Sequence, residues 1–163
     1  MPLLPDSPSA KLSIAAQQVG YPNGLALMNE GRQMVVSETF AANIALFDVS
    51  TDGTLKNKRP FYLFDNQGFH VTFDKNDVPD DLTRYYPDGL DYDISRDMVW
   101  VASPGKNEVL GIKNNKMMFK IKTQGIPFDC TIGGEQYDTL YIGTALPSSK
   151  GWAGHIESVK IKE

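Results

Sequence analysis

The feature that most constrains this chain is a short phrase that its sequence repeats. Residues 21–27 read Tyr-Pro-Asn-Gly-Leu-Ala-Leu, and residues 86–92 read Tyr-Pro-Asp-Gly-Leu-Asp-Tyr. A weaker third copy begins at residue 126 with Ile-Pro-Phe-Asp-Cys, and each copy leads into a strand-like apolar run. Repetition at a period of about 40–50 residues is typical of propellers and other repeat architectures, so it outweighs local assignments of secondary structure.

Short apolar runs, separated by turn residues, surround each copy of the phrase. Four such runs follow one another between residues 25 and 64, with turns at Asn29–Gly31 and Ser50–Gly53 and no amphipathic helix. This pattern predicts an all-β chain, a β-propeller of about three four-stranded blades. We expect the third blade to be incomplete, because the sequence ends three strands into it.

The repeat also predicts how the chain is divided, with all of residues 1–163 in a single half-propeller domain. The expected parts, in order, are a lead-in at 1–10, a spare outer strand at 11–20, a blade at 21–65, a loop insertion at 66–85, a blade at 86–124 and an incomplete blade at 125–163. The insertion is acidic and rich in turn residues. It is either part of a binding face or an ordinary solvated loop.

Composition and charge narrow the possible functions. The formal net charge is −4 and the Lys and Arg residues are scattered, which argues against nucleic acid as a partner. No apolar run approaches the length of a transmembrane helix, so we expect no membrane partner. The single cysteine, Cys130, rules out an intrachain disulfide and suits a cytoplasmic location. We expect Cys130 to be a buried apolar residue rather than a nucleophile.

Several short motifs follow one another in a fixed order along residues 20–163. They include Pro22-Asn23-Gly24-Leu25-Ala26, Phe47-Asp48-Val49 before Asp52-Gly53-Thr54-Leu55, Pro87-Asp88-Gly89-Leu90, Val99-Trp100-Val101-Ala102, and Asp138-Thr139-Leu140-Tyr141. Taken together, this order resembles the SMP-30/gluconolactonase/LRE-like family of six-bladed propellers. The chain resembles only the C-terminal half of such a protein.

The resemblance implies a metal-dependent hydrolase. Members of the family bind one divalent cation, often calcium, and hydrolyse lactones or related esters. Their ligands are a Glu from the first blade, the Asn of the Pro-Asn-Gly phrase and the Asp of the Pro-Asp-Gly phrase. Asn23 and Asp88 match the last two, so the resemblance makes both metal ligands and makes Asp88 the catalytic general base. Ca²⁺ is the expected cation, with Mg²⁺ or Zn²⁺ as alternatives.

Two further site residues follow from the alignment of the repeats. Phe128 occupies the position of Asn23 and Asp88 in the third repeat, and we expect Phe128 and Asn23 to contact the substrate. The first-blade Glu of the family has no counterpart in this chain. Glu38 does not replace it, because Glu38 stands at a different point of its repeat.

A three-bladed arc has two uncovered blade faces, which proteins manage by closure or pairing. We therefore expect a homodimer in which two copies close one six-bladed ring, with the strand at 11–20 completing the last blade. Two copies each of Asn23, Asp88 and Phe128 would then meet at the axis. Three functions stay open: a lactone or ester hydrolase with its active site there, a non-catalytic small-ligand-binding or interaction module, and a truncated product that joins another chain.

Overall fold

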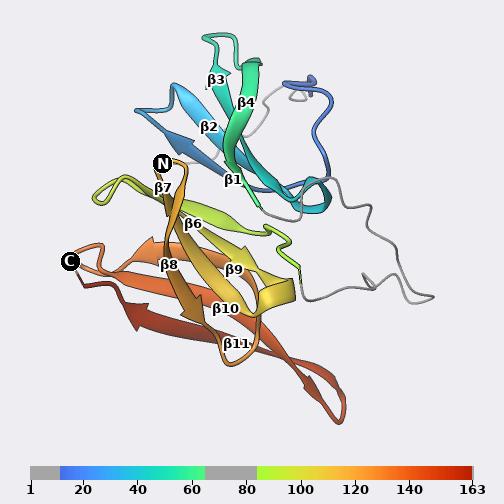
Figure 1. Cartoon of the computed structure of the whole chain (residues 1–163), viewed down its shortest axis with the longest axis vertical. Helices are drawn as coiled ribbons and strands as arrows, with labels where there is room; N and C mark the ends of the chain where they lie inside the picture. Colours follow the sequence, from blue (N-terminus) through green and yellow to red (C-terminus); the bar gives the residue numbers. More distant parts are fainter. Residues whose placement is uncertain (1–11, 65–83, 163) are drawn as a thin grey trace, which may run out of the picture.

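The structure is a computed structural model, and it describes residues 12–64 and 84–162. Figure 1 shows three antiparallel sheets stacked in chain order, which we name blade 1, blade 2 and blade 3 from top to bottom. Blade 1 consists of β1 (Pro22–Met28), β2 (Gln33–Glu38), β3 (Asn43–Val49) and β4 (Leu55–Leu63). Blade 2 consists of β5 (Leu90–Asp93), β6 (Met98–Ser103), β7 (Glu108–Lys113) and β8 (Lys116–Lys122). Blade 3 consists of β9 (Ile126–Gly133), β10 (Thr139–Ser148) and β11 (Gly151–Lys160).

The strand order confirms the all-β architecture expected from the repeat. Each sheet is a simple meander, with orders β1-β2-β3-β4, β5-β6-β7-β8 and β9-β10-β11. Short 3₁₀ helices, η1 (Thr39–Ala41) and η2 (Pro104–Lys106), follow the second strands of blades 1 and 2. The first strands β1, β5 and β9 contact one another in sequence, so the three copies of the repeated phrase lie side by side.

The outer strand expected over residues 11–20 is not formed in the described part of that segment. Residues 12–19 contain no strand and run along blade 1 instead, where the Leu55 amide donates a 2.9 Å hydrogen bond to the Ala15 carbonyl. Ala16 and Val19 pack on that blade's apolar face. Only Ala16 and Val19 are partly buried there, whereas Leu12 and Ile14 are exposed. The lead-in at 1–10 and insertion residues 66–83 lie outside the described residues.

The hydrophobic core lies between the blades rather than within any one of them. One cluster joins blade 1 to blade 2 through buried residues that include Val35, Ile44, Leu90, Val99, Val101, Leu110 and Ile112. A second cluster joins blade 2 to blade 3 through Met98, Trp100, Val109, Cys130, Leu140, Ile142 and Ile161. Burial of each large apolar side chain contributes about 1.5–3 kcal/mol, so the stacking of blades supplies most of the stability.

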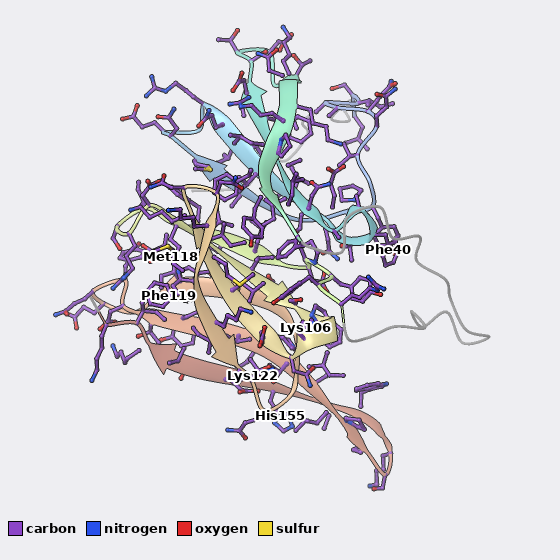
Figure 2. All side chains as sticks on the ribbon, in the orientation of Figure 1. Phe40, Lys106, Met118, Phe119, Lys122 and His155 are labelled. Carbon is purple, nitrogen blue, oxygen red and sulfur yellow. The ribbon has the colours of Figure 1, made fainter. Side chains whose placement is uncertain are left out.

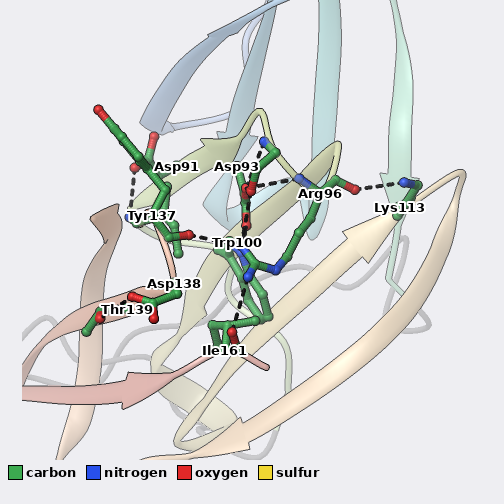
Figure 3. Close-up of polar contacts among 11 residues, drawn as sticks. Asp91, Asp93, Arg96, Trp100, Lys113, Tyr137, Asp138, Thr139 and Ile161 are labelled. Atoms are coloured by element: carbon green, nitrogen blue, oxygen red, sulfur yellow. Dashed lines mark hydrogen bonds and ion pairs between the residues drawn. The ribbon is translucent and has the colours of Figure 1, made fainter. Parts of the chain in front are cut away.

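A polar network also joins blade 2 to blade 3 (Figure 3). The Arg96 guanidinium, in the turn after β5, binds Asp93 Oδ2 at 3.1 Å and the main-chain oxygens of Tyr137 and Ile161 at 3.0 and 3.1 Å. Burial raises the pKa of Asp93, but hydrogen bonds from Ser95 and Arg96 outweigh it and hold that pKa below its ordinary value. Arg96, held by its ion pair with Asp93, therefore ties the turn of blade 2 to the C-terminal end of blade 3 through two hydrogen bonds to main-chain oxygens.

Candidate functional site

The repeated phrases meet where the innermost strands begin. Asn23 lies at the start of β1, and Asp88 lies two residues before β5. The Gly24 amide donates a hydrogen bond to the Asp88 carbonyl at 3.2 Å, and the Gly89 amide donates one to the Phe128 carbonyl at 2.9 Å. The backbone of each phrase is thus bonded to the next, and this places the three variable positions in a row.

The glycines of the two phrases are required by this close approach. A Cβ on Gly24 would lie 2.4 Å from the Leu90 amide nitrogen, and one on Gly89 would lie 2.0 Å from Asp129 Oδ1. Neither glycine has a positive φ. Their role is therefore to let neighbouring inner strands touch, and not to form the tight turn that Pro-Asn-Gly and Pro-Asp-Gly commonly indicate.

Two buried hydroxyls hold the Pro-Asp-Gly phrase from blade 1. The Ser37 hydroxyl lies within hydrogen-bond reach of the carbonyl oxygens of both Gly24 and Asp88. The Thr39 hydroxyl donates to the Pro87 carbonyl at 2.9 Å. This support could not be predicted from the sequence, because a lone Ser or Thr in or next to a strand has no distinguishing context.

The side chains of Asn23 and Asp88 are brought together, as the resemblance implies. Burial raises the pKa of Asp88 to about 6, the charge of Asp129 adds to that rise, and a hydrogen bond from Asn23 opposes it. Asp129 is a member of the site that the sequence analysis missed. The available signal was its place directly after Phe128, at the position that glycine occupies in the other two phrases.

Phe128 lies apart from the Asn23–Asp88 pair in its side-chain surroundings. Its ring is partly exposed and lines a hollow of about 360 Å³ on the face of blade 3 that points away from blade 2. The hollow is lined by Phe128, Asp129, Gly143, Thr144, Gly154, His155 and Ile156. His155 belongs to β11 in the lowest sheet of Figure 2. Asp129 is therefore the residue that links this hollow electrostatically to Asp88.

The atoms of the site that could bind a metal ion are all oxygens. The carboxylates of Asp88 and Asp129 and the amide of Asn23 suit Ca²⁺ or Mg²⁺, whereas zinc prefers nitrogen and sulfur ligands. Within residues 12–64 and 84–162, no three His, Cys, Asp or Glu side chains form a group that could hold a metal ion. Glu38 is engaged elsewhere, since its buried carboxylate accepts hydrogen bonds from Gly20 and, at 2.6 Å, from Lys58.

Two other expectations can be compared with the structure. Cys130 is a free, buried cysteine, and burial raises the pKa of its thiol well above the ordinary value, so it has the character of a core residue. None of the described segments forms a helix that is both long and apolar enough to span a bilayer.

The stacked antiparallel blades, two of four strands and one of three, define the chain as part of a β-propeller, and solved structures share this fold. A luciferin-regenerating enzyme aligns with a TM-score of 0.63 and 21% identity, over 85% of this chain and 44% of its own. A gluconolactonase from Xanthomonas campestris aligns with a TM-score of 0.56 and 24% identity, over 85% of this chain and 39% of its own. Regucalcin, a calcium-binding protein from Agrobacterium tumefaciens, aligns with a TM-score of 0.58 and 14% identity, over 75% and 37%.

The sequence places the chain within one family of propellers. The model of the SMP-30/Gluconolactonase/LRE-like region matches residues 3–146, so the chain belongs to this family. No curated protein matches the chain significantly. The chain spans less than half the length of the three solved structures named above.

Proposed function

We propose that this chain is a metal-dependent lactone or ester hydrolase of the gluconolactonase type. Membership of the family and the fold shared with a gluconolactonase support the reaction class. Asp88 is the proposed catalytic residue, and Asn23 and Phe128 are the proposed substrate contacts. The single cysteine is consistent with a cytoplasmic location for this activity.

The observation that carries the proposal is the position of Asp88, which the bonded repeat phrases bring beside Asn23 and Asp129 at the start of the inner strands. In the metal-free chain, burial and the charge of Asp129 raise the pKa of Asp88 to about 6, which leaves most of the carboxyl groups ionised at neutral pH and makes them stronger bases than an ordinary aspartate. A general base works best when its pKa lies near the operating pH, so Asp88 is suited to accept a proton from attacking water. Asn23 lies beside that carboxylate and favours its charged form.

A calcium ion is the proposed cofactor, with magnesium or zinc as alternatives. Asp88, Asn23 and Asp129 would hold it, because their oxygen atoms suit a hard cation and its charge would offset the repulsion between the two carboxylates. When bound, such an ion polarises an ester carbonyl and lowers the pKa of a bound water. With the cation bound, the negative charges of Asp88 and Asp129 would be balanced without a Lys or Arg side chain.

The test is lactone turnover by the purified chain. Protein freed of metal with a chelator is assayed against γ- and δ-lactones and phenyl acetate, alone and with Ca²⁺, Mg²⁺ or Zn²⁺. We expect cation-dependent hydrolysis, and we expect Asp88→Asn to reduce it by about 100-fold or more, as loss of a general base does. Asp52→Asn is the matched control, because Asp52 lies in the exposed turn between β3 and β4, away from Asp88. Equal turnover by Asp88→Asn and the unaltered chain would refute the role of Asp88.

A second candidate function is a non-catalytic small-ligand-binding module. The hollow beside Phe128 favours it, because Phe128 lines this hollow whereas Asn23 and Asp88 do not. The prediction is saturable binding of a lactone, seen by titration calorimetry, with no hydrolysis under any of the three cations. Phe128→Ala should weaken that binding, while Asp88→Asn should leave it unchanged.

A further inference from the structure

Three buried residues, Ser37, Glu38 and Thr39, stand where β2 ends and η1 begins. Successive side chains of an extended chain point to opposite faces of its sheet. Glu38 accordingly stays within its own blade, where it accepts a hydrogen bond from the Gly20 amide. Ser37 and Thr39 instead reach blade 2, where both hydroxyls donate to carbonyl groups of the Pro-Asp-Gly phrase. The phrase that carries Asp88 is therefore held by side chains of the preceding blade.

The equivalent positions of blade 2 carry no hydroxyl. Strand pairing and the two short helices align the end of β6 with the end of β2. Ala102 then corresponds to Ser37. Pro104 corresponds to Thr39, and neither an Ala nor a Pro side chain can donate a hydrogen bond. Blade 2 thus offers the third phrase no hydroxyl at these positions, and the pair in blade 1 is specific to the phrase of Asp88.

The two hydroxyls hold the two peptide groups that flank the Asp88 Cα atom. Thr39 donates at 2.9 Å to the Pro87 carbonyl, which belongs to the peptide group before that Cα. Ser37 bonds the Asp88 carbonyl, which belongs to the peptide group after it and also accepts a hydrogen bond from the Gly24 amide at 3.2 Å. Peptide groups are planar, so fixing both of them fixes the φ and ψ of Asp88. These angles set the direction in which its side chain leaves the backbone.

We propose that Ser37 and Thr39 are positioning residues, which hold the Asp88 side chain beside Asn23 and Asp129. This inference rests on the proposed function, in which Asp88 is the catalytic residue. Both hydroxyls act through the main chain, because the groups that they bond are backbone carbonyls. A misplacement of about 1 Å in a reacting group can lower a rate about 100-fold, and loss of a residue that supports a ligand typically costs about 10–100-fold.

Thr139 in blade 3 provides a matched control for Thr39. Both side chains belong to buried residues that are 8% exposed. The Thr139 hydroxyl also donates one hydrogen bond, to Asp138 Oδ1 at 3.0 Å. Thr139 pairs with Gly133 at the end of β9, whereas the third phrase lies at the start of that strand. Thr139→Val therefore removes a comparable hydroxyl away from the repeated phrases.

The first experiment is amide hydrogen exchange by NMR on the full chain, without metal or substrate. The Gly24 amide donates to the Asp88 carbonyl, and the Asp88 amide, in the peptide group that Thr39 holds, donates to Ala102. We expect Ser37→Ala to speed exchange of the Gly24 amide, and Thr39→Val that of the Asp88 amide, by about 5-fold or more. The Leu110 amide in buried β7 reports any general loss of stability and should change less.

The control and a conservative variant should leave these amides unaltered. In Thr139→Val, exchange at Gly24 and Asp88 should stay within about 2-fold of the parent chain. Thr39→Ser keeps the hydroxyl, so we expect it to restore the exchange rate that Thr39→Val changes. Circular dichroism should show all four variants folded.

Kinetics of δ-lactone hydrolysis at saturating Ca²⁺ provide the second readout. We expect kcat to fall about 10-fold or more in Ser37→Ala and Thr39→Val with KM within about 2-fold, because the proposed substrate contacts remain while the base is misplaced. Thr39→Ser and Thr139→Val should keep the parent kcat.

Two results would overturn the inference. One is exchange at Gly24 and Asp88 that no variant alters, and the other is a parent-like kcat in both Ser37→Ala and Thr39→Val. A parent chain that hydrolyses no lactone would instead refute the proposed function. The exchange rates would then decide by themselves whether the two hydroxyls hold Asp88.

Discussion

Replacing Asp88 by Asn tests whether burial and Asp129 destabilise the charged carboxylate. The folded protein holds the pKa of this group at about 6, against the ordinary value of 3.8. A raised pKa favours folding below about pH 4, where the group is protonated in both states, and this advantage is lost as pH rises toward 6. Above pH 6 the folded protein carries the full cost of the buried charge. The neutral amide of Asn removes that cost at every pH.

The size of the effect follows from the shift. A difference of about two pKa units corresponds to roughly 3 kcal/mol at 1.36 kcal/mol per unit. Asp88 is only partly buried, so solvent screening reduces this to about 1.5 kcal/mol. We therefore expect Asp88→Asn to be more stable than the parent by about 1.5 kcal/mol at pH 7.5, relative to the difference between the two proteins at pH 4.

Urea denaturation of both proteins at pH 4, 5, 6 and 7.5 measures this difference directly. The two chains differ only at residue 88. Subtracting their unfolding free energies at each pH therefore cancels the contribution of groups that do not interact with that residue. Asp129→Asn provides an internal check, because loss of the neighbouring charge should move the pH midpoint of the parent's stability change downward. A stability difference that stays constant from pH 4 to 7.5 would show that Asp88 is not perturbed and would remove the main support for its role as a base.

Three further substitutions test the framework around the site, each by urea denaturation. Gly89→Ala should cost about 1–3 kcal/mol, because the new methyl group meets the Asp129 carboxylate at 2.0 Å, whereas Gly143→Ala meets its nearest neighbour at 3.8 Å and should be tolerated. Arg96→Met should cost about 3 kcal/mol, since it leaves a buried carboxylate in blade 2 without its ion pair. Ser37→Ala should cost about 1 kcal/mol, because it removes the one hydroxyl proton shared by the Gly24 and Asp88 carbonyls, while the Gly24 amide still donates to Asp88.

The sequence predicted the fold well because the repeat carries the same information several times. Each copy of the phrase marks the start of an innermost strand, and the apolar runs between copies supply the rest of a blade. The outer strand expected at 11–20 stays a prediction, because its expected partner is the last blade of a closed ring. In the described residues, the nearest apolar surface, blade 1, decides where residues 12–19 lie.

The candidate site was only half predictable, and the reason is geometric. Asn23 and Asp88 stand at one repeat position, so alignment of the phrases was enough to bring them together. Asp129 stands one position later, where the other repeats have glycine, and alignment gave it no role. Its carboxylate reaches Asp88 because it packs on Gly89, which has no side chain to keep it away. Alignment of the repeats compares residue types, so it does not reveal a contact that forms only because a neighbouring glycine has no Cβ.

The same repeat explains why site and assembly are connected in this chain. A side chain on an inner strand faces either the next blade or the previous one. It is buried when that blade packs against it. Asp88 is in the middle blade and has neighbours on both sides, so its environment is complete within one chain and its pKa is already raised. Phe128 is in blade 3 and lines an open hollow that neither Asn23 nor Asp88 lines. A change in assembly should therefore alter the hollow beside Phe128 far more than the titration of Asp88.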